Sequence, residues 1–157
     1  MRFVIAGQGK NTSTVMVPLR IRLVDIVQVA AGALFDLTGR VLIAQRIPGK
    51  HLAGRWEFPG GKIATGESAT QALMRELQEE LGVVVHDPLC FKTLRHQYSD
   101  RCIELTLFIV ERFEGVPQGL DGQALKWVRL EVLHKADILE ADRPFIKSLQ
   151  QRAALAI

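Results

Sequence analysis

Apolar and polar residues alternate or cluster along this chain in the short runs that are typical of β-strands. Val24–Phe35, with the sequence VDIVQVAAGALF, predicts a strand, and Val41–Ala44 predicts the returning strand across a turn at residues 36–39. Residues 47–56 contain Pro and Gly and are expected to form a loop. Further strands are predicted at Val83–Val85, Phe91–His96, Cys102–Phe113 and Lys126–Leu130.

The spacing changes to that of a helix between the second and third of these strands. The apolar residues recur with a helical period, at Ala72, Leu73, Leu77 and Leu81. Ser68 and Gln71 have the spacing of a capping box, which predicts that the helix begins at Ser68, and Gly82 predicts where it ends. A second, amphipathic helix is predicted over residues 143–154.

Strands on both sides of one central helix predict an α+β domain with a mixed central β-sheet sandwiched by helices. Residues 21–157 are expected to form this single domain. Residues 1–20 differ in character and predict a flexible N-terminal extension, or a functional start at Met16. The run Gly7–Lys10 lacks the G-x4-G-K-[ST] spacing, so it does not predict a phosphate-binding loop.

The central helix carries three carboxylates, the second and third of which lie three and four residues after the first. Glu76, Glu79 and Glu80 therefore lie on one helix face and repel one another. A hard divalent cation, Mg²⁺ or Mn²⁺, would offset that repulsion. The alternative is a solvated acidic helix face without metal.

Composition narrows the range of functions. The chain has 157 residues, 48% of them hydrophobic and 24% charged, with a net charge of +3. No basic run suggests polymeric nucleic acid, whereas a small polyanionic ligand suits the mild positive charge. Cys90 and Cys102 have no CxxC spacing and are expected to be buried free thiols in a reducing cytosol. No apolar run has the length of a membrane span or signal peptide, so a cytoplasmic protein without membrane contact is expected.

The segment from Gly61 to Val83 meets every fixed position of the pattern G-x5-E-x7-R-E-U-x-E-E-x-G-U, where U is aliphatic. This segment resembles the signature box of the Nudix hydrolases, which cleave nucleoside diphosphates linked to another group. The flanking sequences WEFPGGK (56–62) and ERFEG (111–115) are similar to the MutT-like members of that family, which hydrolyse 8-oxo-dGTP. The resemblance extends from about residue 24 to about residue 150 and implies a Nudix-type α/β/α sandwich.

The resemblance also implies roles for the residues of the box. The residues implied as ligands of the catalytic cation are Glu76, Glu79, Glu80 and the backbone carbonyl of Gly61. Arg75 is expected to orient the acidic cluster, and Glu67 to steady the loop rather than to ligate metal directly. Asp121 aligns with a further acid of the family, where the relatives carry glutamate. It is one methylene shorter, and Asp121–Gly122 is also an ordinary turn pair, so either Asp121 or a glutamate of the box is the general base.

The remaining implied residues would contact the nucleotide. Arg46 and Lys62 match positions that bind phosphates, and Phe58 and Arg101 match positions that flank the purine, although Phe58 is also a candidate core residue. Asp142 stands where MutT-like relatives carry an asparagine that reads the oxidised guanine. Asp142 is equally a candidate N-cap of the last helix, with Pro144 in its first turn.

The resemblance implies a Mg²⁺-dependent nucleoside triphosphate pyrophosphohydrolase that converts 8-oxo-dGTP to 8-oxo-dGMP and pyrophosphate. Such an enzyme sanitises the nucleotide pool and prevents mutations. Asp142 in place of asparagine leaves a (d)CTP or modified-pyrimidine pyrophosphatase as an alternative. A non-catalytic Nudix module that senses a ligand is the alternative from another class. The expected partner is a small nucleotide, and the expected state is a monomer or weak dimer.

Overall fold

The computed structural model describes residues 25–156. The expectations for residues 1–20 and for a start at Met16 lie outside the described residues. None of the helices in the described part of the chain is both long enough and apolar enough to cross a membrane.

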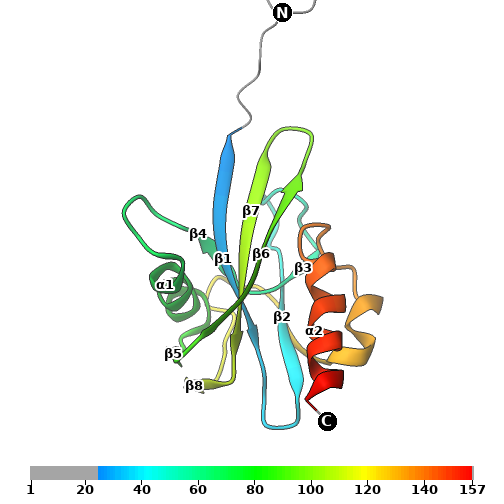
Figure 1. The fold of residues 1–157 in the computed structure, drawn as a ribbon. Coiled ribbons are helices and arrows are strands. Elements are labelled where there is room, and N and C mark those ends of the chain that lie inside the picture. Colours follow the sequence, from blue (N-terminus) through cyan, green and yellow to red (C-terminus); the bar gives the residue numbers. More distant parts are fainter. Residues whose placement is uncertain (1–24, 157) are drawn as a thin grey trace, which may run out of the picture.

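A four-stranded mixed sheet forms the centre of the fold (Figure 1). Its strands lie in the order β4 (Gly60–Lys62), β1 (Ile26–Leu34), β7 (Cys102–Val110) and β6 (Leu89–Gln97). β1 pairs with β7 in parallel over its whole length, whereas the pairs β1–β4 and β6–β7 are antiparallel. The predicted mixed sheet is thus confirmed.

Two smaller antiparallel sheets accompany it. One contains β3 (Trp56–Glu57), β2 (Arg40–Gln45) and β9 (Leu125–Arg129), and the other pairs β5 (Val84–His86) with β8 (Arg112–Glu114). The β1–β2 turn was predicted, and Asp36 stabilises it by accepting hydrogen bonds from the backbone N–H of Thr38 and Arg40. β3 and β4 were not predicted, because strands of two or three residues carry no detectable alternation.

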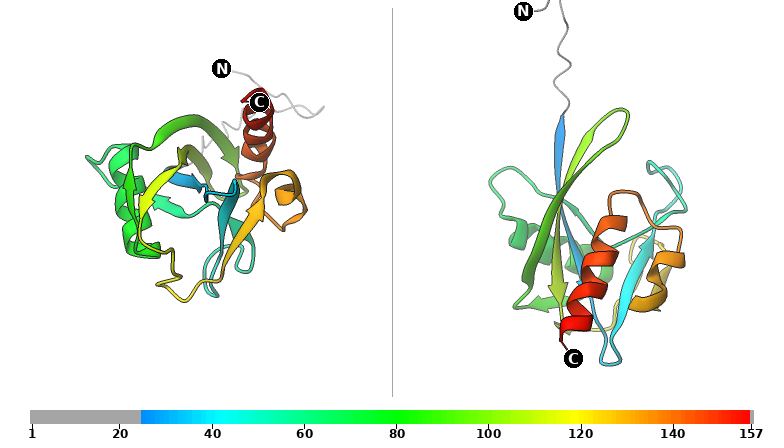
Figure 2. Two further views of the ribbon diagram at one scale, coloured as in Figure 1. Left: turned by 90° about the horizontal axis from the view of Figure 1, so that it is seen from below. Right: turned by 45° about the vertical axis from the view of Figure 1, so that its right-hand side comes forward.

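The two α-helices, α1 (Ala69–Leu81) and α2 (Arg143–Leu155), lie on opposite sides of the strands, as the view from below in Figure 2 shows. Each helix covers its own part of the core. Leu73 and Leu77 of α1 pack with Phe108, whereas Phe145 of α2 packs with Leu107. Successive residues of β7 therefore point to opposite helices, which explains why this strand is continuously apolar and buried from Leu107 to Val110. The 3₁₀ helix η1 (Leu130–Lys135) was not predicted.

Local sequence fixes both ends of α1 as predicted. The Ser68 side chain accepts a hydrogen bond from the Gln71 backbone N–H, and the Gln71 side chain accepts one from the Ser68 backbone N–H. Gly82 ends the helix in the left-handed conformation, with φ of 70°. The four apolar residues of the predicted stripe are all fully buried.

Two predictions about the strands and cysteines are wrong. The strand predicted as Cys102–Phe113 is two strands, because the chain leaves the central sheet after Val110 and β8 turns to pair with β5. Cys90 is exposed and Cys102 half-buried, although both are free as expected. Cys90 lies on the edge strand β6 beside a register shift, where no further strand covers it, so its apolar neighbours in sequence did not indicate burial.

Candidate active site

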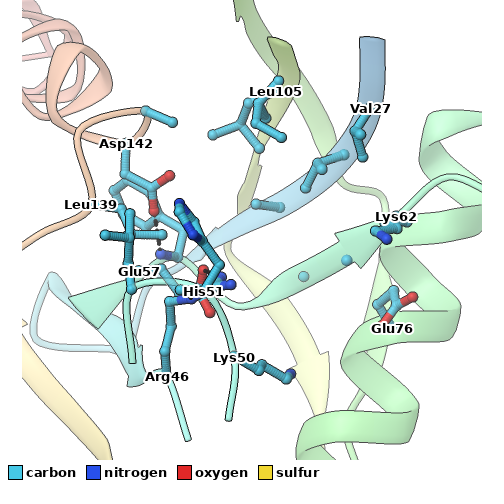
Figure 3. Close-up of a pocket in the computed structure, with 18 of the residues that line it drawn as sticks. Val27, Arg46, Lys50, His51, Glu57, Lys62, Glu76, Leu105, Leu139 and Asp142 are labelled. Atoms are coloured by element: carbon cyan, nitrogen blue, oxygen red, sulfur yellow. Dashed lines mark hydrogen bonds and ion pairs between the residues drawn. The ribbon is translucent and has the colours of Figure 1, made fainter. Parts of the chain in front are cut away.

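A cavity of about 490 Å³ opens between β1, β7 and the loop that follows β2. Figure 3 shows Asp142 and Leu139 at one end of this cavity and Lys62 and Glu76 at the other. Val27 and Leu105 contribute to an apolar wall between them. Both the volume and the mixture of an apolar wall with a few polar groups are typical of small-molecule sites.

The acidic end of the cavity depends on a close approach between β4 and α1. A Cβ atom added at Gly61 would lie 2.3 Å from Cδ of Glu76, so only glycine lets the carboxylate rest against this backbone. Glu76 and Glu80 both line the cavity. The side chain of Glu79 is 60% exposed and does not line the cavity.

Arg75 holds the acidic residues together. Its guanidinium pairs with Glu67 at 2.7 Å, with Glu76 at 2.8 Å and with Glu79 at 3.3 Å, and it donates to the backbone carbonyl of Lys62. The pKa of Glu67 falls to about 2 because this carboxylate accepts hydrogen bonds from Arg75 and from the Ala64 backbone. Arg75 thus supplies part of the positive charge that the helix face requires, and Glu67 ties the loop to α1.

Glu80 is the acid of the box that Arg75 does not reach. Burial, together with the nearby charges of Glu76, Asp121 and Glu57, raises its pKa to about 7 against the opposing charge of Lys50. Asp121 is absent from the main cavity and lines a small adjoining space together with Glu80. The side chain of Gln123 links the two, since it accepts from the Asp121 N–H and donates to the Glu80 carbonyl.

The donors at this end suit a hard divalent cation. Within residues 25–156 no three acidic, histidine or cysteine side chains are already gathered as a complete metal site. The groups present are nevertheless oxygen donors, the cradle at Gly61 places one carboxylate against a backbone, and Glu80 lies near the charges of Glu76 and Asp121. Mg²⁺ and Mn²⁺ favour such ligands.

Arg46 is partly engaged by other residues of the cavity wall. Its Nη1 donates to Oε2 of Glu57 at 2.7 Å, and its Nε donates to the backbone carbonyl of His51 at 2.7 Å. Burial raises the pKa of Glu57, which Arg46 and Lys50 counteract. Lys50, His51 and Glu57 line the cavity and were not singled out from the sequence, where only the similarity of the WEFPGGK segment pointed to Glu57.

Phe58 and Asp142 meet at the apolar end. Phe58 is 3% exposed and belongs to the core, yet it also lines the cavity. A core role and a place beside a bound ligand are therefore both compatible with its position. Its backbone N–H donates to Oδ2 of Asp142 at 2.8 Å. Asp142 occupies the predicted N-cap position of α2, with Pro144 in the first turn, but its side chain binds the Phe58 N–H and makes no capping hydrogen bond. Burial raises the pKa of Asp142 to about 8, and the charge of Glu57 adds to this effect.

The tip of the β6–β7 hairpin closes one side of the cavity. Arg101 lines the cavity, as the sequence suggested, and pairs with Asp100 at 2.6 Å. Tyr98 also lines it, and its hydroxyl accepts a hydrogen bond from the Ala141 N–H at 3.3 Å. Sequence reasoning missed Tyr98, since nothing near it in the chain indicates a contact with residue 141.

Comparison with known proteins agrees with this geometry. A family model described as NUDIX domain matches residues 30–148. An 8-oxo-dGTP diphosphatase of Escherichia coli is 39% identical over 124 residues, which cover 79% of this chain and 96% of that protein. A CTP pyrophosphohydrolase of Escherichia coli is 36% identical over 116 residues, which cover 74% of this chain and 86% of that protein.

Solved structures show the same fold. The Escherichia coli ORF135 protein superposes with a TM-score of 0.74 at 35% identity, covering 83% of this chain and 94% of that one. A MutT structure from work on Aliivibrio salmonicida and Vibrio cholerae gives a TM-score of 0.70 at 32% identity, covering 82% and 99%. The match of the family model over most of the chain, together with these relatives, shows that the chain belongs to the NUDIX domain family.

Proposed function

We propose that this protein is a divalent-metal-dependent nucleoside triphosphate pyrophosphohydrolase that converts 8-oxo-dGTP to 8-oxo-dGMP and pyrophosphate. The observation that carries the proposal is the cavity itself, which joins glutamates of a complete Nudix box to the buried carboxyl of Asp142. A triphosphate would lie toward Glu76 and Glu80, and its base would lie against the apolar wall. The similarity to 8-oxo-dGTP diphosphatases supports this choice of substrate.

The acidic end would hold the cation, Mg²⁺ or Mn²⁺. The residues proposed to hold it are Glu76, Glu79, Glu80, Asp121 and the carbonyl of Gly61. When bound, a divalent cation neutralises phosphate charge and lowers the pKa of a bound water. Arg75 keeps Glu76 and Glu79 oriented through its ion pairs. Two carboxyl groups are candidates for accepting the proton of the attacking water, that of Glu80, whose pKa lies near 7, and that of Asp121 beside it.

Arg46 and Lys62 are proposed to bind the phosphates. Glu57 holds the Arg46 guanidinium in a fixed orientation at the cavity wall, so its remaining N–H groups are preorganised for an anion. Lys62 lies beside the acidic end, where its ammonium charge would offset that of a phosphate. Water attack would separate the nucleoside monophosphate from pyrophosphate.

Asp142 is proposed to read the base, with Phe58 and Arg101 beside it. A carboxyl whose pKa is about 8 is mainly protonated at neutral pH. In that form it offers one donor and an acceptor, as an asparagine amide does. The carbonyl oxygen and the hydroxyl of the acid would then face the donors and acceptors along one edge of an oxidised guanine.

A second candidate is a (d)CTP or modified-pyrimidine pyrophosphohydrolase. The specific observations in its favour are the carboxyl at Asp142, where MutT-like relatives carry asparagine, and the 36% identity to a CTP pyrophosphohydrolase. The chemistry at the acidic end would be the same for both candidates.

A substrate panel tests the proposal. Purified protein with Mg²⁺ should hydrolyse 8-oxo-dGTP with a higher kcat/KM than dGTP, CTP or dCTP, and chromatography should identify 8-oxo-dGMP and pyrophosphate. Higher kcat/KM for CTP or dCTP would favour the second candidate. Calorimetric nucleotide binding without any turnover would instead indicate a ligand-sensing module.

Glu79→Gln separates an enzyme from a binding module. We expect turnover to fall by several orders of magnitude while the melting temperature in metal-free buffer stays near wild type, because removing one charge relieves repulsion on this face. Glu131→Gln, in an exposed position on η1, is the matched control and should retain full turnover. A melting temperature well below wild type for Glu79→Gln would contradict the second half of this expectation.

We also propose that residues 21–157 form one catalytic domain that acts as a monomer or weak dimer on a small nucleotide. Deletion of residues 1–20 should leave kcat/KM and the melting temperature unchanged. Sedimentation of the deleted and the full chain would give the oligomeric state. A loss of activity on deletion would show that the extension belongs to the domain.

A further inference from the structure

Arg46 begins a series of contacts that runs around the wall of the cavity. On one side, its Nε binds the carbonyl of His51, which anchors the loop after β2. On the other side, its Nη1 binds the carboxylate of Glu57 in β3. The guanidinium therefore ties this loop to the short strand that leads into Phe58.

The series continues from β3 to the segment before α2. The N–H of Phe58 binds the carboxyl of Asp142, and the N–H of the preceding residue, Ala141, donates to the hydroxyl of Tyr98. The pairs are separated by 84 and 43 residues in the sequence. These two hydrogen bonds attach residues 141 and 142 to two different segments of the chain.

The ring of Tyr98 contacts the loop after β2, so the series of contacts closes on itself. Its centroid lies 5.6 Å from that of His51, with the ring planes at 84°, and 4.5 Å from that of His96, with the planes at 67°. Such edge-to-face contacts are favourable for aromatic rings. The side chain of Gln97 braces the hairpin tip by donating to the carbonyls of Tyr98 and Arg101.

The members of this closed series of contacts all line the same cavity, namely Arg46, His51, Glu57, Phe58, Tyr98, Ala141 and Asp142. The loop after β2 has no regular structure and places Leu52 at a φ of 57°, in the left-handed region that a leucine seldom adopts. Its position therefore depends on contacts such as those with Arg46 and Tyr98. Removal of the Tyr98 side chain would break this closed series of contacts between Ala141 and His51.

We propose that Tyr98 is a positioning residue that determines base specificity, because it fixes the segment carrying Asp142 and ties it to the loop carrying His51. This rests on the proposed function for the identity of the ligand, a nucleotide base, but not for the positioning itself. Tyr98 acts through Asp142 and needs no contact with the reacting phosphates. Its loss should therefore change which base is preferred more than the rate of hydrolysis.

Tyr98→Phe and Tyr98→Leu test the proposal in two steps. Tyr98→Phe removes the acceptor for the Ala141 N–H and keeps the ring, whereas Tyr98→Leu also removes the edge-to-face contacts. Thr93→Val is the matched control, since it removes a hydroxyl and its 2.9 Å hydrogen bond to Thr106 on the same hairpin, away from the cavity. Melting temperatures should show that each variant is folded.

The first measurement is hydrogen exchange at the Ala141 amide, which requires no activity. Exchange should be faster in both Tyr98 variants than in wild type and unchanged in Thr93→Val. The second is the ratio of kcat/KM for 8-oxo-dGTP to that for dGTP. It should fall by about 2- to 10-fold in Tyr98→Phe, as expected for one hydrogen bond, and further in Tyr98→Leu. The kcat for the preferred substrate should stay close to wild type.

Unchanged Ala141 exchange in Tyr98→Phe would overturn the positioning role, and so would an unchanged substrate ratio in both folded variants. A parallel fall of kcat for every substrate would also overturn it, because it would indicate damage to the site as a whole. If the wild-type protein hydrolyses no triphosphate, the proposed function fails. The positioning role is then decided by the exchange of Ala141 alone. If Tyr98→Leu does not fold, Tyr98→Phe decides both measurements.

Discussion

Gly60 and Gly61 are adjacent in β4 but are required for different reasons. A Cβ at Gly61 would meet the carboxyl of Glu76, the end of a side chain that can move. A Cβ at Gly60 would lie 2.1 Å from the carbonyl oxygen of Ala30, and Gly60 has a φ of 155°. The missing side chain at Gly61 makes room for the Glu76 carboxyl, and the missing side chain at Gly60 makes room for the neighbouring strand β1.

Alanine should therefore impair the reaction at Gly61 and the stability of the fold at Gly60. We expect Gly61→Ala to fold with a melting temperature near wild type but to lose most Mg²⁺-dependent turnover, because the Glu76 carboxylate must leave its cradle. We expect Gly60→Ala to unfold or melt far below wild type, because backbone atoms cannot give way. Circular dichroism melts and turnover on one triphosphate would check both. Full activity in Gly61→Ala would show that the cradle has no part in the reaction.

Arg75 contacts Glu67 with Nε and Nη2 of its planar guanidinium, and it contacts both Glu76 and Glu79 with Nη1. A lysine keeps the charge but cannot bridge all three. We expect Arg75→Lys to weaken Mg²⁺ affinity or turnover by about 10- to 100-fold, the range found when partners of metal ligands are removed. Calorimetric titration with Mg²⁺ and steady-state turnover would measure this. Arg112→Lys, in an exposed ion pair with Asp87, is the control.

At the scale of an element, α1 both packs against the core and positions the glutamates of the acidic face. Its buried stripe packs on β1 and β7, and the partly buried Glu76 and Glu80 lie beside that stripe and line the cavity. The cap at Ser68 and the left-handed Gly82 fix the two ends. The register of the glutamates therefore follows from local features that are read directly in the sequence.

Ser68 offers a test of this element. Ser68→Ala should lower the free energy of unfolding by about 1 kcal/mol, which corresponds to a melting temperature lower by about 2–4 °C in a domain of this size. Ser68→Asp keeps an acceptor for the Gln71 N–H and should restore most of the loss. Turnover should change little in either variant, since neither moves Glu76. Equal destabilisation by both substitutions would contradict the capping role.

The central helix and the turn between β1 and β2 were predicted because their signals lie within a few residues of one another. Capping boxes, helical stripes and turn residues act over three or four positions. β8 and the 3₁₀ helix η1 were missed for the opposite reason. Where the chain leaves the central sheet after Val110 is decided by pairing with β5, and no glycine or proline marks that point in the sequence.

At the scale of the whole molecule, two buried acids set the pH dependence of stability. The pKa of Asp142 is raised to about 8 and that of Glu80 to about 7, in both cases mainly by burial. Between the ordinary carboxyl range and these values, the folded protein binds more protons than the unfolded chain. Stability therefore falls as the pH rises through this range. The acids with lowered pKa, Asp36 and Glu67 at about 2, act only at lower pH.

We expect the metal-free protein to be most stable near about pH 5 and to lose stability steadily up to about pH 8. Asp142→Asn keeps an acceptor for the Phe58 N–H but has no charge to bury, so it should flatten this decline. Asp25→Asn, in an exposed position, should not. Urea unfolding across this pH range with chelator present would measure the slopes. A wild-type stability that rises toward about pH 8 would contradict the burial of Asp142 as a neutral acid.

The sequence alone determined the family, the layered α+β architecture, the acidic helix face with its capped ends, and the residues to examine for phosphate and base. These depend on neighbours in the chain or on a continuous motif. Only the tertiary structure decided that Arg46 is held by Glu57, that Asp142 binds Phe58 instead of capping α2, that Tyr98 reaches Ala141 and that Cys90 is exposed. The physical reason is that burial, and the pKa of a buried acid, depend on which distant segments exclude water from a side chain. That exclusion arises only when strands and loops far apart in the sequence pack together.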